Sequence, residues 1–177
     1  FNTDSEEAVN VLNESQIRIH SIALIHEKLY QSDDLSRISF DHYVRELARL
    51  IVDLIVDVER EVDITIDSDE IYMTINQAIP CGLILNELIT NAYKHAFEEA
   101  GSGKIRVSMH RRGQQVRLQF EDNGTGVPDD LDFENPSSLG LKLIGTLCRQ
   151  LEAEYHFDTG ELGGLRFVLR FSLEPSL

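Results

Sequence analysis

The hydrophobic residues in the first third of the chain recur with a helical period. Residues 5–31 contain no glycine or proline, and Ile22, Ile25 and Leu29 follow one another at helical spacing. Other apolar residues lie on adjoining sides of this segment, which predicts a long helix that packs on more than one side, in a hairpin or a dimer bundle. After a polar break, the pattern predicts a second helix over about residues 40–56.

The middle of the chain changes from a helical period to an alternating one. β-Branched residues alternate with polar ones in residues 62–66 and again in 71–75, which predicts two strands separated by a turn. A third helix is predicted over about residues 77–97. Pro80 does not argue against it, because proline is tolerated in the first turn of a helix.

The last third begins with an alternating pattern on both sides of a glycine-containing turn. This pattern predicts a hairpin of two strands, residues 104–110 and 115–121. A further helix is predicted over residues 139–152, and two strands over residues 155–158 and 165–173. Helices and strands interleave without a strict repeat. We therefore expect an α/β sandwich, a mixed sheet covered by helices on one face, preceded by the long N-terminal helix.

Composition excludes several classes of protein. The net charge of −15 disfavours binding to nucleic acid, because the chain has no excess of cations to neutralise a phosphate backbone. An anionic ligand would need a local pocket of backbone N–H groups, a cation or a metal ion. No apolar run approaches the roughly 20 residues of a membrane span, and no signal peptide is visible.

Two further observations bear on the setting of the chain. It begins with Phe1 rather than methionine, so we expect a piece of a longer protein. Cys81 and Cys148 lie far apart in apolar helical segments, which is typical of buried thiols in a reducing compartment rather than of a disulfide or a metal pair.

The third predicted helix has two unlike faces. At about 100° per residue, Glu87, Asn91 and Lys94 fall in one narrow sector with His95 at its edge, and apolar residues occupy the opposite side. A carboxylate, a carboxamide and an ammonium group on one face could together hold a metal ion and a phosphate chain. An ordinary solvated helix face is the alternative, because such residues are common on surfaces.

Glycines mark two other candidate sites. Residues 122–126 (Asp-Asn-Gly-Thr-Gly) directly follow a predicted strand. Asp122 could there accept a hydrogen bond from an exocyclic amine, while Gly124 and Gly126 let the backbone approach a flat ring. The same sequence is also a good turn. Residues 138–141 (Ser-Leu-Gly-Leu) begin a predicted helix, where N–H groups can receive phosphate or where the serine is a plain N-cap.

These three elements, in this order, resemble the nucleotide-binding boxes of sensor histidine kinases. Residues 86–97 resemble the N box, residues 122–126 the G1 box, and residues 138–141 a reduced G2 box. The segment Ile-His-Glu-Lys-Leu-Tyr-Gln-Ser at 25–32 resembles the second dimerisation helix of the HisKA_2 (HWE-related) subgroup. The N and G1 boxes are also shared with the wider GHKL ATPase superfamily that includes Hsp90, gyrase and MutL, and the resemblance implies its Bergerat-type ATP-binding fold.

The resemblance assigns the adenine and the metal to particular residues. It implies that the chain binds ATP together with Mg²⁺. Asp122 would accept the adenine amino group, with Gly124 and Gly126 forming the wall beside it. Asn91 would ligate the Mg²⁺ that bridges the phosphates.

The remaining residues of the boxes would act on the phosphate chain. Lys94 and His95 would lie near it, and Glu87 would orient or deprotonate the phosphate acceptor. The N–H groups of Ser138, Leu139, Gly140 and Leu141 would lie under a short ATP lid, residues 128–137.

The chain departs from the family pattern at three points. The G2 region has a single glycine, Leu165 stands where relatives often have a threonine that helps bind adenine, and no phenylalanine box is evident, although Phe133 lies in the lid. The phospho-acceptor histidine of the family lies on the helix upstream of residue 5. His20 and His26 fall on the second helix, so we expect this chain to bind ATP without phosphorylating itself.

The resemblance implies an organisation and a set of partners. Residues 1–34 would be the second helix of a dimerisation hairpin, and residues 35–177 the ATP-binding catalytic domain. The parent would be a homodimer that transfers the γ-phosphoryl group to the upstream histidine and then to an aspartate of a response-regulator receiver domain. A cytoplasmic location is expected, in a parent that is either soluble or membrane-anchored. The alternatives are an anti-sigma-type serine kinase and a degenerate, non-enzymatic nucleotide-binding or dimerisation module.

Overall fold

A computed structural model describes residues 3–31, 37–55, 61–97, 102–126 and 138–175. The described chain forms four α-helices, which are α1 (Thr3–Gln31), α2 (Phe40–Ile55), α3 (Ile75–Asn91) and α4 (Leu139–Gln150). The four helices predicted from the apolar period are thus present. The third is shorter than predicted, because a π-helical turn, η1 (Ala92–Ala96), replaces its last turn.

The principal sheet has five strands. In spatial order they are β2 (Glu61–Ser68), β4 (Ser102–Arg112), β5 (Gln115–Asp122), β7 (Leu165–Ser172) and β6 (Glu154–Thr159). β2 runs parallel to β4 and all other pairs are antiparallel, so the sheet is mixed. The two-residue strands β1 (Ile38–Ser39) and β3 (Tyr72–Met73) pair separately.

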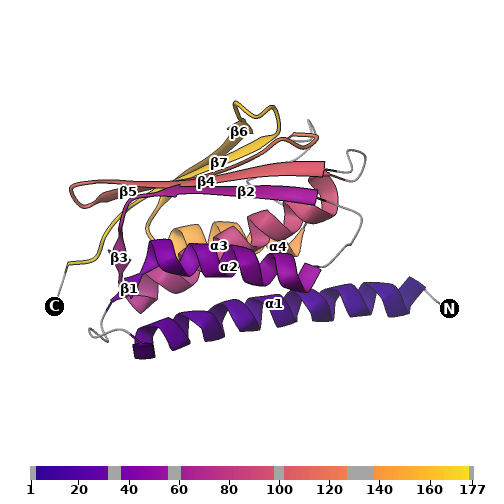
Figure 1. Cartoon of the computed structure of the whole chain (residues 1–177), viewed down its shortest axis with the longest axis horizontal. Coiled ribbons are helices and arrows are strands. Elements are labelled where there is room, and N and C mark those ends of the chain that lie inside the picture. The colour runs from indigo at the N-terminus through magenta and orange to yellow at the C-terminus, as the bar shows by residue number, and fades with distance from the viewer. Residues whose placement is uncertain (1–2, 32–36, 56–60, 98–101, 127–137, 176–177) are drawn as a thin grey trace.

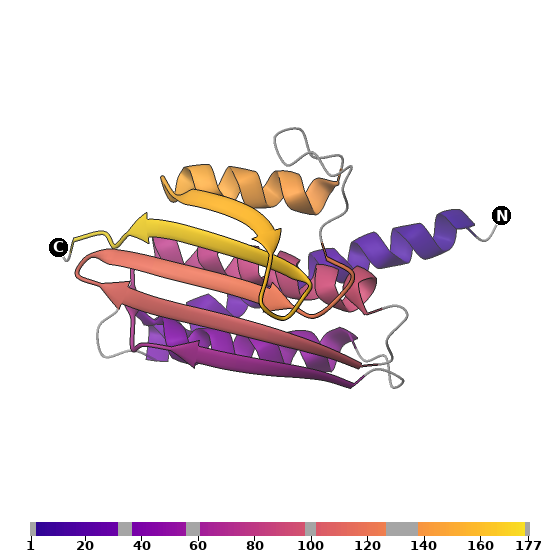
Figure 2. The same ribbon diagram turned by 90° about the horizontal axis from the view of Figure 1, so that it is seen from above.

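The elements stack in three layers. Helices α2, α3 and α4 cover one face of the sheet, and α1 lies on the outer side of α2 and α3 (Figure 1). Seen from above, the N-terminal end of α1 extends past the sheet (Figure 2). The core between sheet and helices is built on large side chains without exposed surface: Phe40, Tyr43, Phe97, Phe120 and Phe167. This arrangement confirms the predicted α/β sandwich with a preceding helix.

The sequence predicts two strands joined by a turn at 62–66 and 71–75. In the structure, these two segments do not pair with each other. The first belongs to β2 and pairs with β4, whereas β3 pairs with β1 outside the principal sheet, and Ile75 already begins α3. An alternating pattern indicates an extended, half-buried segment but carries no information about its partner strand. The partners are set by contacts between residues about 40 positions apart, such as Ile64 and Ile105.

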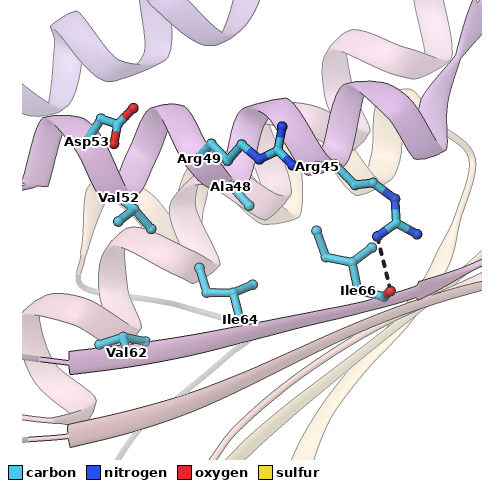
Figure 3. Close-up of a pocket in the computed structure, with 8 residues that line it drawn as sticks. All are labelled: Arg45, Ala48, Arg49, Val52, Asp53, Val62, Ile64 and Ile66. Atoms are coloured by element: carbon cyan, nitrogen blue, oxygen red, sulfur yellow. Dashed lines mark hydrogen bonds between the residues drawn. The ribbon is translucent and has the colours of Figure 1, made fainter.

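Strand β2 is an edge of the sheet, and α2 lies beside it. Val62, Ile64 and Ile66 of β2 face α2 across a groove of about 420 Å³, and Arg45 donates a hydrogen bond of 3.5 Å to the main-chain oxygen of Ile66 (Figure 3). Edge strands with unpaired backbone groups invite association with other chains, and a covering helix with a charged side chain reduces this tendency. No residue of this groove lines the cavity described below.

Cys81 and Cys148 are both free and buried, which agrees with their predicted burial. Burial in apolar surroundings raises the pKa of each thiol, so both stay protonated and unreactive at neutral pH.

Candidate functional site

The carboxylate of Asp122 lies at the end of β5, where that strand meets the beginning of β7. Its Oδ1 accepts hydrogen bonds from the N–H of Gly124 at 2.9 Å and of Leu165 at 3.1 Å. The N–H of Gly164 donates to the main-chain oxygen of Asp122 at 3.2 Å. The side chain is therefore fixed from both strands by the backbone. Within the described chain its other oxygen, Oδ2, has no donor.

Burial sets the electrostatics of Asp122. The residue is only 2% exposed, and this desolvation raises the pKa of its carboxyl group, while the two N–H donors act in the opposite direction. A buried carboxylate normally has its acceptor capacity filled. Among the described residues, donors fill only Oδ1 of Asp122, which leaves Oδ2 for a donor from a ligand.

Two glycines permit the close approach of the loops around Asp122. A Cβ at Gly164 would lie 2.5 Å from the main-chain oxygen of Asp122, and one at Gly124 would lie 2.6 Å from the main-chain oxygen of Ala96. Gly126 has φ of +84°, which strains any other residue. The predicted role of Gly126 in a wall is compatible with its position at the cavity, whereas Gly124 packs against the end of η1.

A cavity of about 230 Å³ opens beside Asp122, between the sheet and the helical segment formed by α3 and η1. Its lining residues come from α3 and η1, the loop after β5, the start of α4, and strands β6 and β7: Leu88, Asn91, Ala92, His95, Ala96, Asp122, Thr125, Gly126, Ser138, Leu141, Phe157 and Leu165. Its volume is just below the roughly 300–1,000 Å³ of sites for drug-sized ligands, which suits one ring system better than a whole nucleotide.

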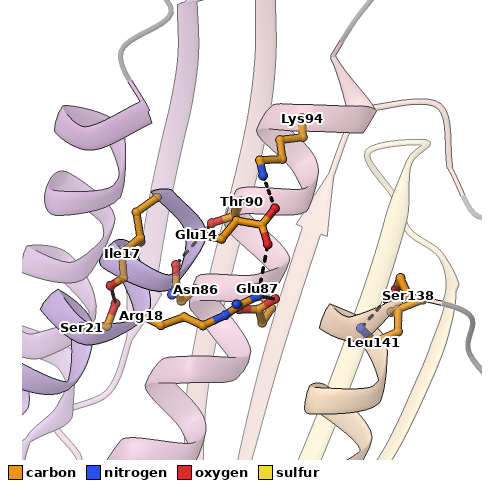
Figure 4. A network of polar contacts seen from close by, with 10 residues as sticks. All are labelled: Glu14, Ile17, Arg18, Ser21, Asn86, Glu87, Thr90, Lys94, Ser138 and Leu141. Carbon is orange, nitrogen blue, oxygen red and sulfur yellow. Dashed lines mark hydrogen bonds and ion pairs between the residues drawn. The ribbon is translucent and has the colours of Figure 1, made fainter. Parts of the chain in front are cut away.

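The polar sector predicted on the third helix divides into two. Asn91 and His95 line the cavity. Glu87 and Lys94 instead contact α1, which lies on the other side of the same helix (Figure 4). The π-helical turn begins at Ala92, so the angular phase assumed for a regular α-helix does not hold beyond Asn91.

Glu87 is buried rather than solvated. It is 5% exposed, and both of its oxygens accept hydrogen bonds from Arg18 of α1, at 2.6 Å from Nε and 2.9 Å from Nη2. The ammonium group of Lys94 forms an ion pair with Glu14, also on α1. The alternative of an ordinary solvated face therefore fails for Glu87, since a bidentate, buried ion pair holds it.

The start of α4 approaches the same part of α3. Ser138 is the N-cap, and its Oγ accepts a hydrogen bond of 3.3 Å from the N–H of Leu141. By helix geometry, the N–H groups of Leu139 and Gly140 have no acceptor within the helix. A Cβ at Gly140 would lie 2.8 Å from Oε2 of Glu87, so a larger residue there would displace this carboxylate from its present position.

The structure thus brings part of the predicted site together. Asn91, His95, Asp122, Gly126, Ser138 and Leu141 line one cavity, whereas Glu87, Lys94, Gly124, Leu139 and Gly140 do not line it. Sequence reasoning missed the apolar lining. Leu88, Ala92 and Ala96 belong to the same helical segment as Asn91 and His95, but a regular helical phase placed them on the opposite side, and Phe157 and Leu165 come from distant strands without a local signal.

One departure from the family pattern, at Leu165, gains a structural context. Leu165 contributes its backbone N–H to Asp122 and its side chain to the cavity, so its contact with Asp122 does not depend on a hydroxyl group. The predicted lid with Phe133 lies outside the described residues. His20 and His26 are both exposed on α1.

The described residues contain neither a cluster of metal-binding side chains nor a helix able to span a membrane. No group of three or more His, Cys, Asp or Glu in this part of the chain could hold a metal ion. A Mg²⁺ bound chiefly by phosphate oxygens needs no such cage, and the half-buried carboxamide of Asn91 at the cavity is a suitable single protein ligand. Among the helices described, none is long and apolar enough to cross a membrane.

Comparison with known proteins finds sensor histidine kinases and also a serine-protein kinase, RsbW of Listeria innocua, which is 30% identical over 87 residues, 41% of this chain and 55% of that protein. Sensor histidine kinase PdtaS of Mycobacterium tuberculosis is 29% identical over 170 residues, which is 95% of this chain and 34% of PdtaS. Blue-light-activated histidine kinase 2 of Erythrobacter litoralis is 31% identical over 109 residues, 61% of this chain and 32% of that protein. The chain thus spans about a third of the length of these two histidine kinases.

A solved structure and two family models agree with this likeness. The histidine kinase domain of the blue-light-activated kinase EL346 from E. litoralis superposes with a TM-score of 0.79 at 23% identity, covering 90% of this chain and 75% of that one. A histidine kinase family model matches residues 2–55. The model of the histidine kinase-, DNA gyrase B- and HSP90-like ATPases matches residues 76–175, more than half of the sequence. The chain therefore belongs to the histidine kinase-, DNA gyrase B- and HSP90-like ATPase family.

Proposed function

We propose that this chain is the ATP-binding catalytic part of a two-component sensor histidine kinase, with the second dimerisation helix still attached. The observation that carries the proposal is Asp122, a buried strand-end carboxylate with one oxygen fixed by two backbone N–H groups and the other left for a ligand. An adenine amino group beside the cavity supplies the missing donor. In this assignment residues 1–34 form the helix and residues 35–177 the catalytic domain.

The other predicted residues serve the phosphate end of the nucleotide. Asn91 ligates Mg²⁺, His95 and Lys94 lie along the phosphate chain, and the N–H groups at 138–141 receive phosphate oxygens at the start of α4. Gly124 and Gly126 keep the loop close to the adenine. Phosphoryl transfer depends mainly on positioning and on neutralising charge, and these groups provide both.

In the complete protein, the terminal phosphoryl group passes from ATP to a histidine upstream of this chain. The bond between the γ-phosphorus and the bridging oxygen of ADP breaks while a P–N bond to the imidazole forms, and Glu87 orients the imidazole or accepts its proton. The phosphoryl group then passes to an aspartate of a response-regulator receiver domain. The parent acts as a cytoplasmic kinase and as a homodimer through the helical hairpin.

Calorimetry with adenosine, ADP and ATP in the presence of Mg²⁺ tests the proposal directly. We expect the unmodified chain to bind all three. Asp122→Asn should lower each affinity about 10- to 100-fold, because one hydrogen bond to a buried charged acceptor is lost. Asn keeps an oxygen for the N–H groups of Gly124 and Leu165, so its unfolding temperature should not fall. Absence of binding heat at millimolar nucleotide would favour the degenerate module.

The metal role of Asn91 has its own test. Asn91→Ala should remove the Mg²⁺-dependent part of ATP affinity and leave adenosine affinity unchanged, because the apolar contacts of α3 remain intact. Collapse of folding in this variant would instead give Asn91 a structural role.

The serine-kinase alternative is supported less, because a histidine kinase family model matches residues 2–55 in addition to the ATPase model that matches residues 76–175. The two activities leave different products. In the complete protein, acid-labile phosphate after incubation with labelled ATP indicates phosphohistidine, and acid-stable phosphate indicates phosphoserine.

A further inference from the structure

Four charged side chains connect α1 to α3 and η1 in one continuous series. Lys94 pairs with Oε1 of Glu14, Oε2 of Glu14 lies 3.5 Å from Nη2 of Arg18, and Arg18 holds both oxygens of Glu87 (Figure 4). Glu14 and Arg18 lie one turn apart on α1, so the series runs along a single face of that helix. Two residues assigned to the phosphate end are thus engaged by two residues of α1.

The exposure of the two pairs differs. The side chains of Lys94 and Glu14 are 31% and 30% exposed, which leaves their ion pair accessible from solvent. The side chains of Arg18 and Glu87 are only 19% and 6% exposed, and their bidentate contact is the buried end of the series. The outer pair can therefore open while the inner pair keeps α1 in place.

The apolar contacts of α1 also hold the helix without the outer pair. Ile17 and Ile25 are buried in the core, and the hydroxyl of Tyr43 donates to the main-chain oxygen of Ser21. Loss of the Glu14 carboxylate therefore leaves α1 docked. This makes Glu14 a position where charge can be changed without moving the helix.

We propose that Glu14 sets the affinity of the site for the phosphate chain of ATP, because its carboxylate and the triphosphate compete for the ammonium group of Lys94. The proposal rests on the proposed function, in which Lys94 lies beside the phosphates. A lysine already paired with a carboxylate offers less attraction to a second anion than an unpaired one. The competition acts on ATP and ADP and has no effect on adenosine, which lacks phosphate.

The test compares nucleotide affinities of the unmodified chain and Glu14→Gln, measured by calorimetry with Mg²⁺ at low ionic strength. We expect ATP to bind about 2- to 5-fold more tightly to Glu14→Gln, the range of a partly exposed ion pair, and adenosine to bind equally to both. Glu154→Gln on β6, an exposed residue, is the matched control for the change of net charge and should bind ATP like the unmodified chain.

A second variant shows whether the effect passes through Lys94. In a Lys94→Gln background, Glu14→Gln should no longer change ATP affinity. The proposal is overturned if Glu14→Gln binds ATP no more tightly than the unmodified chain, if adenosine affinity rises equally, or if the gain persists without Lys94. A chain that binds neither adenosine nor ATP overturns the proposed function itself, and this proposal with it.

Discussion

The two ends of the candidate nucleotide site are built in different ways. At the adenine end, Asp122 is held by backbone N–H groups of two adjoining strand ends, and glycines allow the close fit. At the phosphate end, Glu87 and Lys94 are held by side chains of α1, which lie 69 and 80 positions away in the sequence. Backbone contacts cannot change without distorting the sheet, whereas side-chain ion pairs can exchange partners. The first end is therefore fixed, and the second is open to control by a separate helix.

The largest expected effect comes from breaking the fixed end. Gly164→Ala would place a Cβ 2.5 Å from the main-chain oxygen of Asp122 and 2.6 Å from the N–H nitrogen of Gly124. We expect the free energy of unfolding to fall by about 1–3 kcal/mol, as for other overpacked sites. Adenosine affinity, measured by calorimetry, should fall with it.

Gly145→Ala in α4 is the matched control, because its added Cβ would meet only side-chain ends, the hydroxyl of Tyr155 at 3.3 Å and Nη1 of Arg149 at 3.7 Å. Its adenosine affinity should remain unchanged. If Gly164→Ala bound adenosine normally, the close approach at Asp122 would be irrelevant to the ligand.

The buried pair at the phosphate end should show strong coupling. Arg18→Gln and Glu87→Gln each leave a partner unsatisfied, while the double variant removes both charges. A double-mutant cycle in urea unfolding should therefore give a coupling of about 1–3 kcal/mol. A value near zero would mean that α1 is not held to α3 by this contact in solution.

The pH dependence of adenosine binding should report the environment of Asp122. Burial raises the pKa of its carboxyl above the ordinary 3.8, and only the ionised form leaves both oxygens as acceptors. Affinity should thus fall on acidification at a higher pH than for an exposed aspartate. Calorimetry over the range in which the chain stays folded would show a flat profile for Asp122→Asn.

The raised pKa of Asp122 affects folding stability in the opposite direction to adenosine affinity. A raised pKa means that the folded chain binds this proton more tightly than the unfolded chain. The contribution of Asp122 to the free energy of unfolding therefore falls as pH rises from 3.8 through the raised pKa. Loss of the charge in Asp122→Asn should leave neutral-pH stability equal or higher, and a large loss would contradict this assignment.

The smallest effect should come from screening the outer ion pair. The difference in unfolding free energy between the unmodified chain and Glu14→Gln should be about 0.2–1 kcal/mol at low salt. It should shrink at about 1 M salt, where the Debye length is only about 3 Å. Adenosine affinity should hardly change over this range, because the ligand is neutral and its contacts are fixed by backbone. Equal salt sensitivity at both ends would remove the distinction between them.

The sequence by itself determined the local elements and the chemistry. The helical and alternating periods predicted the helices, the β4–β5 hairpin and the sandwich, because each pattern depends on residues only a few positions apart. The order of Glu87–Asn91, Asp122 and Gly140 indicated the family and the ligand. The net charge of −15 disfavoured nucleic acid as a ligand by composition alone.

Only the tertiary structure decided which groups meet. The parallel pairing of β2 with β4, and the approach of Leu165 to Asp122, depend on contacts across many positions that no local pattern encodes. The division of the polar helix face has the same cause. Glu87 and Lys94 meet α1, while Asn91 and His95 meet the cavity, because α1 docks on one side of α3 and the sheet lies on another. A helical phase can show that residues share a sector, but the packed neighbours determine what each of them contacts.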